Sequence, residues 1–379
     1  MKGSQPLGPY VDVVAGTRPE IIKLAPVIHE LRSRGASPRL LLTGQHRELV
    51  NNLLETLELQ DIETIRFDIM QPRQGLSGLA SRILEVLGSH FSQLPAPVIV
   101  IVQGDTTSAM CASLAAFHEK IPVAHVEAGL RSGQIDNPFP EELNRELITK
   151  IARWHFCPTQ HAADNLIRER VNVAHIAITG NTSIDTLQWI QERGLGVSAF
   201  QPCCHRNCRV LVTLHRRENQ GMPMREIATA LVDLAERLDL DVVLPIHPNP
   251  EVRDVLVPIL SHSAFIRITD ALNYADFVAT MADADVVVTD SGGVQEEAPA
   301  VSTATLVVRE TTERPEAVVS GCARLIGVTS IALRNNLEEL VMNPDIRIAM
   351  TQNGSPFGDG HAAERIVERL ISDQGFRIN

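Results

Sequence analysis

The stretch PVIVIVQGDTTSAMCASLAAFHEKIPVAHVEAG, residues 97–129, decides the fold because it contains one complete strand–helix–strand unit. Its two apolar runs, residues 97–103 and 121–126, are rich in β-branched side chains. They flank residues 108–120, whose apolar side chains recur at helical spacing. Strands joined through a helix lie parallel in one sheet, with helices on its faces. The unit therefore predicts an α/β protein.

The same alternation continues in both directions along the chain. A polar stretch, RGLGVSAFQPCCHRN at residues 193–207, interrupts it and is interpreted as an interdomain connector. After this stretch we expect helices at 224–238, 250–260 and 272–282.

We therefore expect two doubly wound Rossmann-like domains, residues 1–181 and 182–360. In such sheets ligands bind beyond the carboxyl ends of the strands. With two domains, we expect the ligand in the cleft between them.

Composition limits the partners. The chain has 379 residues and 44% hydrophobic content, enough for two domains. Its net charge of −12 argues against nucleic acid or an anionic membrane, because both favour a basic face. No apolar run approaches the roughly 18 residues of a membrane span, and the first ten residues contain no hydrophobic signal core. We therefore expect a cytoplasmic protein.

The six cysteines do not form the dense framework of a small secreted domain. Cys203, Cys204 and Cys208 lie close to His205, which suggests a metal site. Zinc sites, however, usually draw their ligands from two separated pairs, and no second pair follows. We expect incidental thiols in a surface connector and no metal.

The loops after the expected strands are rich in ionisable side chains. Each of these residues alone is weak evidence for a functional site. Their common position after the strands is what predicts one. They are Arg18, Lys23, Asp105, Glu127, Arg131, Glu141, Glu142 and Arg145 in the first half, and His215, Arg216, Arg217, His247 and Arg314 in the second.

The segment TDSGGVQEEAPA, residues 289–300, predicts an anion site at the start of a helix. Ser291, Gly292 and Gly293 would present free amides, and the glycines let a phosphate approach the backbone. Glu297, about one helical turn later, can accept hydrogen bonds from a sugar diol. Together these features suggest a nucleotide. The alternative is a capped helix with solvated glutamates.

Two common nucleotide motifs are excluded. The chain has no Gly-Lys pair and hence no phosphate-binding loop of the Walker type. GLGVSA, residues 194–199, matches Gly-x-Gly-x-x-Ala but follows a helix instead of a strand. We expect neither NAD nor any other cofactor.

Eight motifs, in the same order, resemble the signatures of the non-hydrolysing UDP-N-acetylglucosamine 2-epimerases. They are GTRPEIIKLAP, TGQHREL, QGDTTSA, HVEAGLRSG, PFPEELNR, TLHRREN, TDSGGVQEEAP and TTERPEAV. The resemblance implies a glycosyltransferase-B architecture, in which the last helix, within 361–379, packs back on the N-terminal domain. It also implies a homodimer.

The resemblance implies roles for individual residues. Asp105, Glu127, Glu141 and His215 would be the catalytic set. The substrate-binding residues would be Arg18, Lys23, Phe277, Ser291, Gly292, Gly293, Glu297 and Arg314. By the same resemblance, an activating UDP-GlcNAc would bind a second site formed by Gln45, His46, Arg73, Gln74 and Glu146.

The implied reaction is the interconversion of UDP-GlcNAc and UDP-ManNAc. The proton on C2 of the sugar is not acidic until the C1–O bond to UDP breaks. A carboxylate then removes that proton to give 2-acetamidoglucal, and UDP returns with protonation on the opposite face. Carboxylates are needed as acid and base, and cationic groups stabilise the departing diphosphate. Asp105 alone is equally consistent with helix capping.

The chain departs from the family pattern at two places. Leu272 replaces a Gln found in some relatives, and AVSTATLVV, residues 300–308, replaces a Gly-Lys-Pro turn. Alternatives to the implied function are a hydrolysing 2-epimerase, a 2-epimerase of a modified UDP-hexosamine, a glycosyltransferase of the same fold and a non-catalytic UDP-sugar sensor.

Overall fold

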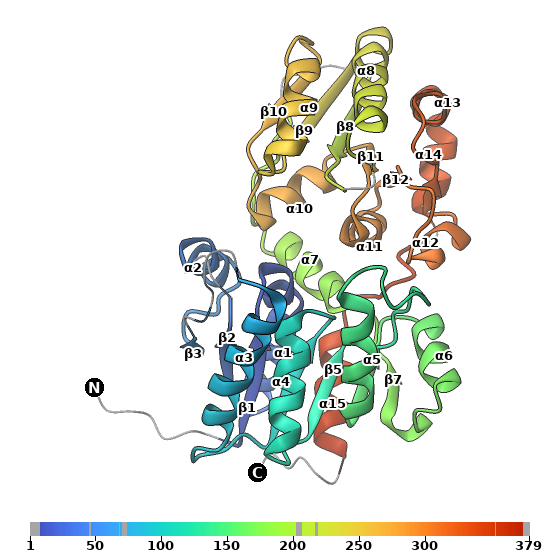
Figure 1. The fold of residues 1–379 in the computed structure, drawn as a ribbon. Coiled ribbons are helices and arrows are strands. Elements are labelled where there is room, and N and C mark those ends of the chain that lie inside the picture. The colour runs from blue at the N-terminus through green and yellow to red at the C-terminus, as the bar shows by residue number, and fades with distance from the viewer. Residues whose placement is uncertain are drawn as a thin grey trace. The chain divides into compact units, whose positions relative to one another are not determined.

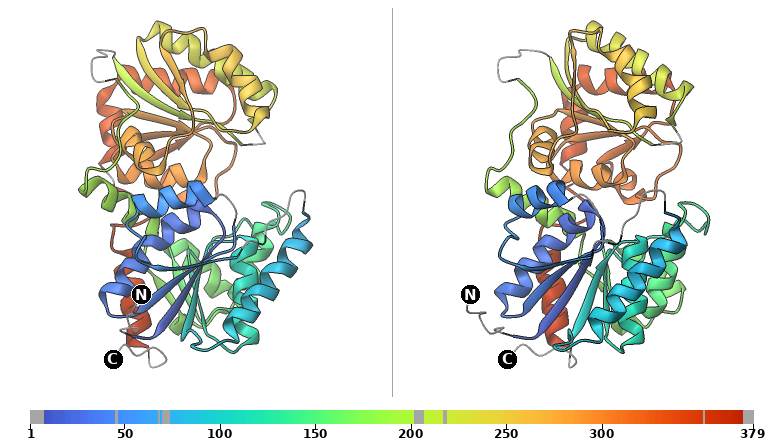
Figure 2. Two further views of the ribbon diagram at one scale, coloured as in Figure 1. Left: turned by 90° about the vertical axis from the view of Figure 1, so that its left-hand side faces the viewer. Right: turned by 60° about the vertical axis from the view of Figure 1, so that its left-hand side comes forward.

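The computed structural model describes residues 8–44, 47–67, 69, 74–201, 207–216, 219–352 and 354–373. The chain forms two compact units, drawn in Figures 1 and 2. The first contains Met1–Thr186 together with Gly358–Asn379, and the second contains Leu187–Phe357.

The first unit is a parallel sheet of seven strands in the order β3-β2-β1-β4-β5-β6-β7. The strands are β1 (Tyr10–Ala15), β2 (Ser37–Leu42), β3 (Glu63–Arg66), β4 (Ile99–Gln103), β5 (Val123–Val126), β6 (Trp154–Cys157) and β7 (Ile176–Ile178). The helices are α1 (Arg18–Ser33), α2 (Arg47–Thr56), α3 (Leu76–Phe91), α4 (Thr107–His118), α5 (Glu141–Ile151), α6 (Gln160–Arg168), the 3₁₀ turn η1 (Val173–His175) and α15 (Ala362–Ser372). Helix α7 (Thr182–Glu192) begins in this unit and ends in the second.

The second unit is a parallel sheet of six strands in the order β10-β9-β8-β11-β12-β13. The strands are β8 (Cys208–Thr213), β9 (Leu240–Pro245), β10 (Ile266–Thr269), β11 (Val286–Thr289), β12 (Ala304–Val307) and β13 (Ala323–Leu325). The helices are α8 (Met222–Arg237), α9 (Pro250–Leu260), α10 (Tyr274–Ala282), α11 (Gly292–Ala300), α12 (Pro315–Val319), α13 (Ser330–Met342) and α14 (Pro344–Thr351).

Helices cover both faces of each sheet, which explains why the strands read as continuous apolar runs (Figures 1 and 2). Val13 and Val14 point to opposite faces of β1, and both are fully buried. The predicted fold class, α/β with two doubly wound parallel sheets, is confirmed. No helix in the described ranges is both long enough and apolar enough to span a membrane.

Each sheet has one topological switch point, where the chain order reverses. In the first unit β1 and β4 are neighbours, and the crossovers leave them in opposite directions. In the second unit β8 and β11 have the same relation. The loops after such a pair diverge and leave room for a ligand beyond the strand ends. The loops β1–α1 and β4–α4, and likewise β8–α8 and β11–α11, are therefore where the fold places a site.

The described part of the expected connector is not a free linker, because it packs on α10 of the second unit. Val197 N–H donates to Asp276 Oδ1 at 2.7 Å, and Ala199 N–H donates to Thr280 Oγ1 at 2.9 Å. Gly196 has a positive φ of 87°, and a Cβ there would lie 2.2 Å from the Ala275 carbonyl oxygen. The remaining connector residues, with Cys203, Cys204 and His205, lie outside the described residues.

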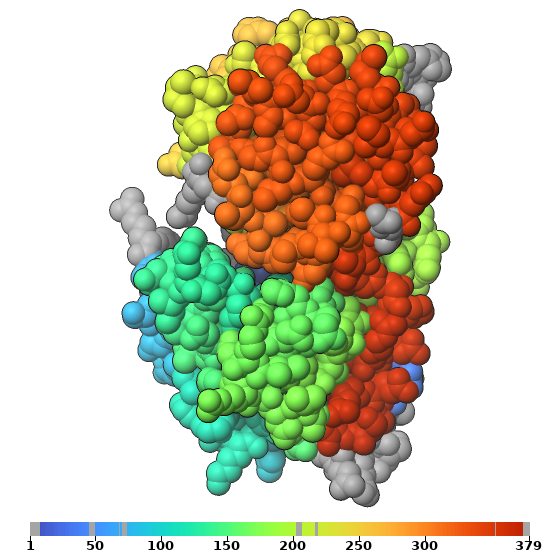
Figure 3. Space-filling view, turned by 90° about the vertical axis from the view of Figure 1, so that its right-hand side faces the viewer, coloured from blue at the N-terminus to red at the C-terminus, as the bar shows by residue number. Residues whose placement is uncertain are grey.

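The last helix, α15, belongs to the first unit. Figure 3 shows it in red on the surface of that unit, where Arg369 donates to the Ala174 carbonyl of η1. Asp185 of α7 accepts a hydrogen bond from Ala363 N–H at 2.7 Å and so caps the start of α15. Ile366 is fully buried. The first unit thus includes a helix, α15, that follows the whole second unit in the sequence.

A buried ion pair crosses the first sheet. Asp12 on β1 is directly opposite Arg39 on β2 and accepts from its Nε at 2.6 Å and its Nη2 at 3.1 Å. His90 Nε2 lies 2.9 Å from Asp12 Oδ2, the oxygen that also accepts from Arg39 Nη2. Asp12 is fully buried, and Arg39 is nearly so.

We expect Asp12→Ala to lower the free energy of unfolding by about 3–5 kcal/mol, because it leaves the Arg39 guanidinium buried without its carboxylate. Urea denaturation followed by circular dichroism measures the loss. Asp61→Ala, at an exposed position, is the matched control and should change stability by less than about 0.5 kcal/mol. A loss at Asp12 no larger than the control would contradict the assignment.

Candidate functional site

The residues predicted from the sequence lie at the carboxyl edges of both sheets. In the first unit they follow β4 and β5 or lie on α1 and α5, and in the second they follow β8 and β11, lie on α10 and α11, or, in the case of Arg314, precede α12.

Glu127 follows β5 and is held by residues from three other segments. Its Oε2 forms an ion pair with Lys23 Nζ and accepts hydrogen bonds from Gln103 Nε2 at 2.9 Å and Asn181 Nδ2 at 3.3 Å. The side chain is only 7% exposed. Glu127 also has a φ of 63°, a left-handed conformation that costs a non-glycine residue about 1–3 kcal/mol and is typical of functional sites.

Asp105 follows β4 and Gly104. Its Oδ2 lies 2.6 Å from Arg145 Nη2, and its main-chain carbonyl accepts from Asn144 Nδ2 at 2.8 Å. The carboxyl side chain remains 26% exposed. Asp105 is therefore fixed by α5 on one side while part of its carboxylate stays open to a ligand.

The loop before Asp105 is supported by a histidine that the sequence analysis missed. His125 on β5 is buried, and its Nε2 lies 2.7 Å from the Gly104 carbonyl oxygen. Burial lowers the pKa of His125 to about 3, so the ring is neutral and can donate this bond from Nε2. His125 opens the motif HVEAGLRSG, but its contact with Gly104 follows from the pairing of β5 with β4.

Glu141 and Glu142, the first two residues of α5, differ in burial and in hydrogen bonding. Glu142 is 1% exposed, accepts from the backbone N–H groups of Ser132 (2.9 Å) and Gly133 (3.0 Å), and pairs with Arg145 at 2.9 Å. Glu141 is half-buried, and no described residue forms a hydrogen bond or ion pair with its carboxylate. Glu142 therefore holds the loop after β5 to α5, whereas the Glu141 carboxylate has no such role among the described residues.

The remaining cations of the first group differ in exposure. Arg18 is the first residue of α1 and is exposed, whereas Lys23 lies one turn further along the helix and is half-buried against Glu127. The structure therefore brings Lys23 and Glu127 together and leaves Arg18 in solvent.

His215 follows β8 and is organised by Asp290 at the end of β11. The fully buried Asp290 carboxylate accepts from the backbone N–H groups of His215 (3.0 Å) and Arg216 (2.9 Å) and from Asn219 Nδ2 (3.1 Å). His215 Nδ1 lies 3.3 Å from the same carboxylate. Asp290 thus joins the two loops of the switch point.

The His215 ring stacks on His247, with centroids 5.3 Å apart and an interplanar angle of 13°. Burial lowers the pKa of His215, and the positive charges of His247 and Arg216 lower it further, while Asp290 opposes the shift. The imidazole therefore stays neutral down to a lower pH than the ring of an exposed histidine does.

The start of α11 has the features of an anion site. Ser291 is the N-cap, and Gly292 and Gly293 are the first two helical residues. A Cβ on Gly292 would lie 3.4 Å from Arg314 Cζ and 3.5 Å from Arg216 Nη2, so two guanidinium groups flank the free amides. Helix N-terminus, absent side chains and adjacent guanidinium groups together favour a phosphate.

Arg314 is held in place by two acids. Its Nε donates to Glu296 Oε1 at 2.7 Å, and its Nη1 donates to Glu313 Oε2 at 3.2 Å. Burial alone would raise the pKa of Glu313, but Arg314, Arg309 and Arg216 outweigh it and lower the value. The guanidinium is therefore fixed before any ligand arrives.

Glu297 is buried on α11 and accepts a hydrogen bond from the Tyr274 hydroxyl of α10 at 2.9 Å. Burial and the Glu297 carboxylate raise the pKa of Tyr274 well above its ordinary value. Phe277 lies on the same helix as Tyr274 and is half-buried. Tyr274 was not among the predicted residues, because its contact depends on the packing of α10 against α11.

Three of the five residues expected at a second site, Gln45, His46 and Arg73, lie outside the described residues. Gln74 accepts a hydrogen bond from Arg82, and Glu146 is half-buried on α5. The expectation of an activating ligand therefore stays a prediction.

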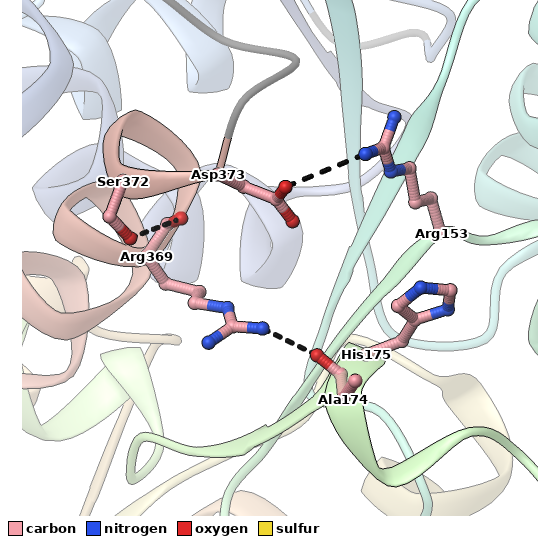
Figure 4. Close-up of a pocket in the computed structure, with 6 residues that line it drawn as sticks. All are labelled: Arg153, Ala174, His175, Arg369, Ser372 and Asp373. Atoms are coloured by element: carbon pink, nitrogen blue, oxygen red, sulfur yellow. Dashed lines mark hydrogen bonds and ion pairs between the residues drawn. The ribbon is translucent and has the colours of Figure 1, made fainter.

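A cavity of about 330 Å³ lies elsewhere in the first unit (Figure 4). Arg153 precedes β6 and His175 precedes β7, so the cavity lies at the amino ends of these strands, opposite the candidate site. Its other lining residues are Ala174, Arg369, Ser372 and Asp373.

Comparisons with known proteins agree over nearly the whole chain. A family model described as UDP-N-acetylglucosamine 2-epimerase matches residues 29–371. The UDP-N-acetylglucosamine 2-epimerase of Escherichia coli (strain K12) is 41% identical over 95% of this chain and 98% of its own length. That of Bacillus subtilis (strain 168) is 39% identical over 97% of this chain and 96% of its own length.

Solved structures show the same similarity. The crystal structure of UDP-GlcNAc 2-epimerase from Neisseria meningitidis bound to UDP-GlcNAc has a TM-score of 0.88 and 36% identity, and it covers 96% of this chain and 100% of its own. The Methanocaldococcus jannaschii UDP-GlcNAc 2-epimerase in complex with UDP-GlcNAc and UDP has a TM-score of 0.78 and 30% identity, and it covers 95% of this chain and 99% of its own.

We expect Glu142→Ala to destabilise the protein by about 1–3 kcal/mol, because it leaves the Ser132 and Gly133 amides and Arg145 without their acceptor. Glu141→Ala is the matched control and should cost less than about 1 kcal/mol. Thermal and urea unfolding of the two variants measures the difference. Equal losses would show that the two glutamates are not structurally distinct.

We expect Asp290→Asn to lower the pKa of His215 further, because the Asp290 carboxylate is the group that raises it against burial. NMR titration of the His215 ring protons measures the change. Asp254→Asn, on the exposed side of α9, should leave that pKa unchanged. A rise in the Asp290→Asn variant would show that Asp290 does not stabilise the charged ring.

Proposed function

Because the chain belongs to the UDP-N-acetylglucosamine 2-epimerase family, we propose that it interconverts UDP-GlcNAc and UDP-ManNAc by inversion at C2 of the sugar. The observation that carries the proposal is the placement of the candidate residues. Asp105 lies at the switch point of one sheet, and His215 and the α11 N-terminus lie at that of the other. We propose that both groups of residues serve this one reaction.

The second unit has the groups that a nucleotide diphosphate requires. The free amides at Ser291, Gly292 and Gly293, with Arg314 and Arg216 beside them, would bind the diphosphate oxygens. Glu297 would accept a hydrogen bond from a ribose hydroxyl, and Phe277 would lie near the uracil. Since Arg314 is already held by Glu296 and Glu313, its position costs little reorganisation when the ligand binds.

The first step of the proposed reaction breaks the C1–O bond, and the bonding electrons leave with the diphosphate. The sugar becomes an oxocarbenium ion, whose positive charge makes the C2 proton acidic. Carboxylates at Asp105, Glu127 and Glu141 would stabilise this cation and accept the proton, which gives 2-acetamidoglucal and UDP. His215 would donate a hydrogen bond or a proton to the departing phosphate.

The second step re-forms the C1–O bond and restores the C2–H bond on the opposite face of the sugar. UDP adds back at C1, and an acid delivers a proton to the other face of C2. The total number of protons and electrons is unchanged, so the reaction is a pure isomerisation. Lys23 pairs with Glu127, and Arg145 pairs with Asp105, so a neighbouring cation holds each of these carboxylates in place.

We expect purified protein incubated with UDP-GlcNAc in heavy water to incorporate deuterium at C2 while UDP-ManNAc forms, as followed by proton NMR. Asp105→Asn and His215→Asn should each reduce the rate by about 10²–10⁴-fold, the usual contribution of a general acid or base. Glu85→Gln, exposed on α3, is the control and should keep the wild-type rate.

The products separate this proposal from its alternatives. Free ManNAc with UDP would indicate a hydrolysing 2-epimerase, and release of UDP only with an acceptor would indicate a glycosyltransferase. Binding without any C2 exchange would leave only a UDP-sugar sensor. Turnover of a different UDP-hexosamine in preference to UDP-GlcNAc would correct the substrate while retaining the reaction.

A further inference from the structure

One buried carboxylate of the first unit has no part in the chemistry proposed above. Glu20 lies in the first turn of α1 and is 2% exposed. No described lysine, arginine or histidine forms an ion pair with it. A buried acid without a cation is costly unless hydrogen bonds satisfy it, so its partners indicate what it does.

The partners of Glu20 come from both loops of the switch point. Its Oε2 accepts from Gly16 N–H at 3.0 Å and from Thr17 Oγ1 at 2.7 Å, both in the β1–α1 loop. Its Oε1 accepts from Thr106 Oγ1 at 2.7 Å, in the β4–α4 loop. Thr106 also caps α4 by accepting from Ala109 N–H at 3.0 Å. One carboxylate therefore connects the starts of α1 and α4.

The two loops are also in close contact beside Glu20. A Cβ on Gly16 would lie 2.2 Å from Ser108 Oγ, so only glycine permits this approach. Thr43 Oγ1, at the end of β2, donates to the same Ser108 hydroxyl at 2.8 Å. The Glu20 bridge thus fixes a contact that leaves little free space.

The loops that Glu20 joins carry residues of the proposed site. Thr106 directly follows Asp105, and Lys23, the partner of Glu127, lies on α1 one turn beyond Glu20. We propose that Glu20 is a positioning residue, which holds Asp105 in register with Lys23 and Glu127 through its bonds to Gly16, Thr17 and Thr106. This inference rests on the proposed function.

Burial raises the pKa of Glu20 to about 7, although its hydrogen bonds to Thr106, Thr17 and Gly16 oppose the shift. A pKa raised in the folded state means that the ionised bridge forms only as pH rises through about 7. Below that pH the protonated acid loses acceptor capacity. The other charged groups nearby are Arg18 and Lys23 on α1, and Asp105 with its partner Arg145 across the loop.

We expect Glu20→Gln to reduce kcat/KM for UDP-GlcNAc by about 100-fold, mostly through kcat, because a small displacement of a catalytic carboxylate has an effect of that size. The fall in wild-type activity below pH 7 should be absent or displaced in this variant. Amide hydrogen exchange of residues 16–20 and 104–109 should become faster in both loops together. Glu85→Gln is the control of identical chemistry at an exposed position.

A second pair of variants keeps the test valid if Glu20→Gln does not fold. Thr106→Val removes only the link to the β4–α4 loop, and Thr106→Ser retains the hydroxyl. We expect the valine variant to lose most of the activity and the serine variant to keep most of it. Combining Thr106→Val with Glu20→Gln should add little further loss, because both changes break the same bridge.

Unchanged kcat/KM, pH profile and exchange in Glu20→Gln would overturn the inference, as would a change in thermal stability alone. Because hydrogen exchange needs no turnover, it tests the bridge even if wild-type protein fails to epimerise UDP-GlcNAc. Failure of the wild-type reaction would refute the proposed function, whereas exchange confined to one loop would refute the bridge.

Discussion

Each sheet of this protein has a pair of neighbouring strands from which the chain departs in opposite directions. Beside each pair, one buried carboxylate accepts hydrogen bonds from the loops that follow the strands. Glu20 accepts hydrogen bonds from the loops after β1 and β4, and Asp290 at the end of β11 accepts from the backbone after β8. Diverging loops leave amides and hydroxyls without strand partners, and buried polar groups must be satisfied. Asp105, His215 and Ser291 stand on the loops that these two acids join by hydrogen bonds.

The two units arrange their charged side chains differently, and the net charge of −12 does not reveal this difference. Arg216 and Arg314 lie beside Gly292 at the start of α11, and Glu296 and Glu313 fix Arg314 from behind. In the first unit the order is inverted, because cations such as Lys23 and Arg145 steady the carboxylates. One unit is thus arranged to receive negative charge and the other to present it. Such fixed groups act without reorganisation during a reaction.

The sequence predicts the fold well because its alternation is regular and each strand is apolar on both faces. It also places His215 and Ser291 at strand ends, since periodicity alone locates the end of a strand. It does not reveal which partners hold these residues. Asp290, His125 and Tyr274 take their roles from contacts between distant segments. Asp290 and His125 lie within the motifs TDSGGVQEEAP and HVEAGLRSG, but those motifs do not show what the two side chains contact. Glu20 is an intermediate case, because Thr17-x-x-Glu20 has the spacing of a capping box, yet its bond to Thr106 depends on the β1–β4 pairing. The connector at 193–201 shows the converse: its composition predicts a loop correctly, but its amides are bound by side chains of α10.

The first unit contains both ends of the chain, because α15 completes it after the whole second unit has been traversed. Ala363 N–H is bonded to Asp185, and Ile366 and Val367 are fully buried in that unit. During synthesis, the amino-terminal sheet therefore emerges from the ribosome without one of its covering helices. Ile366 and Val367 can be buried there only after the second unit, Leu187–Phe357, has been synthesised.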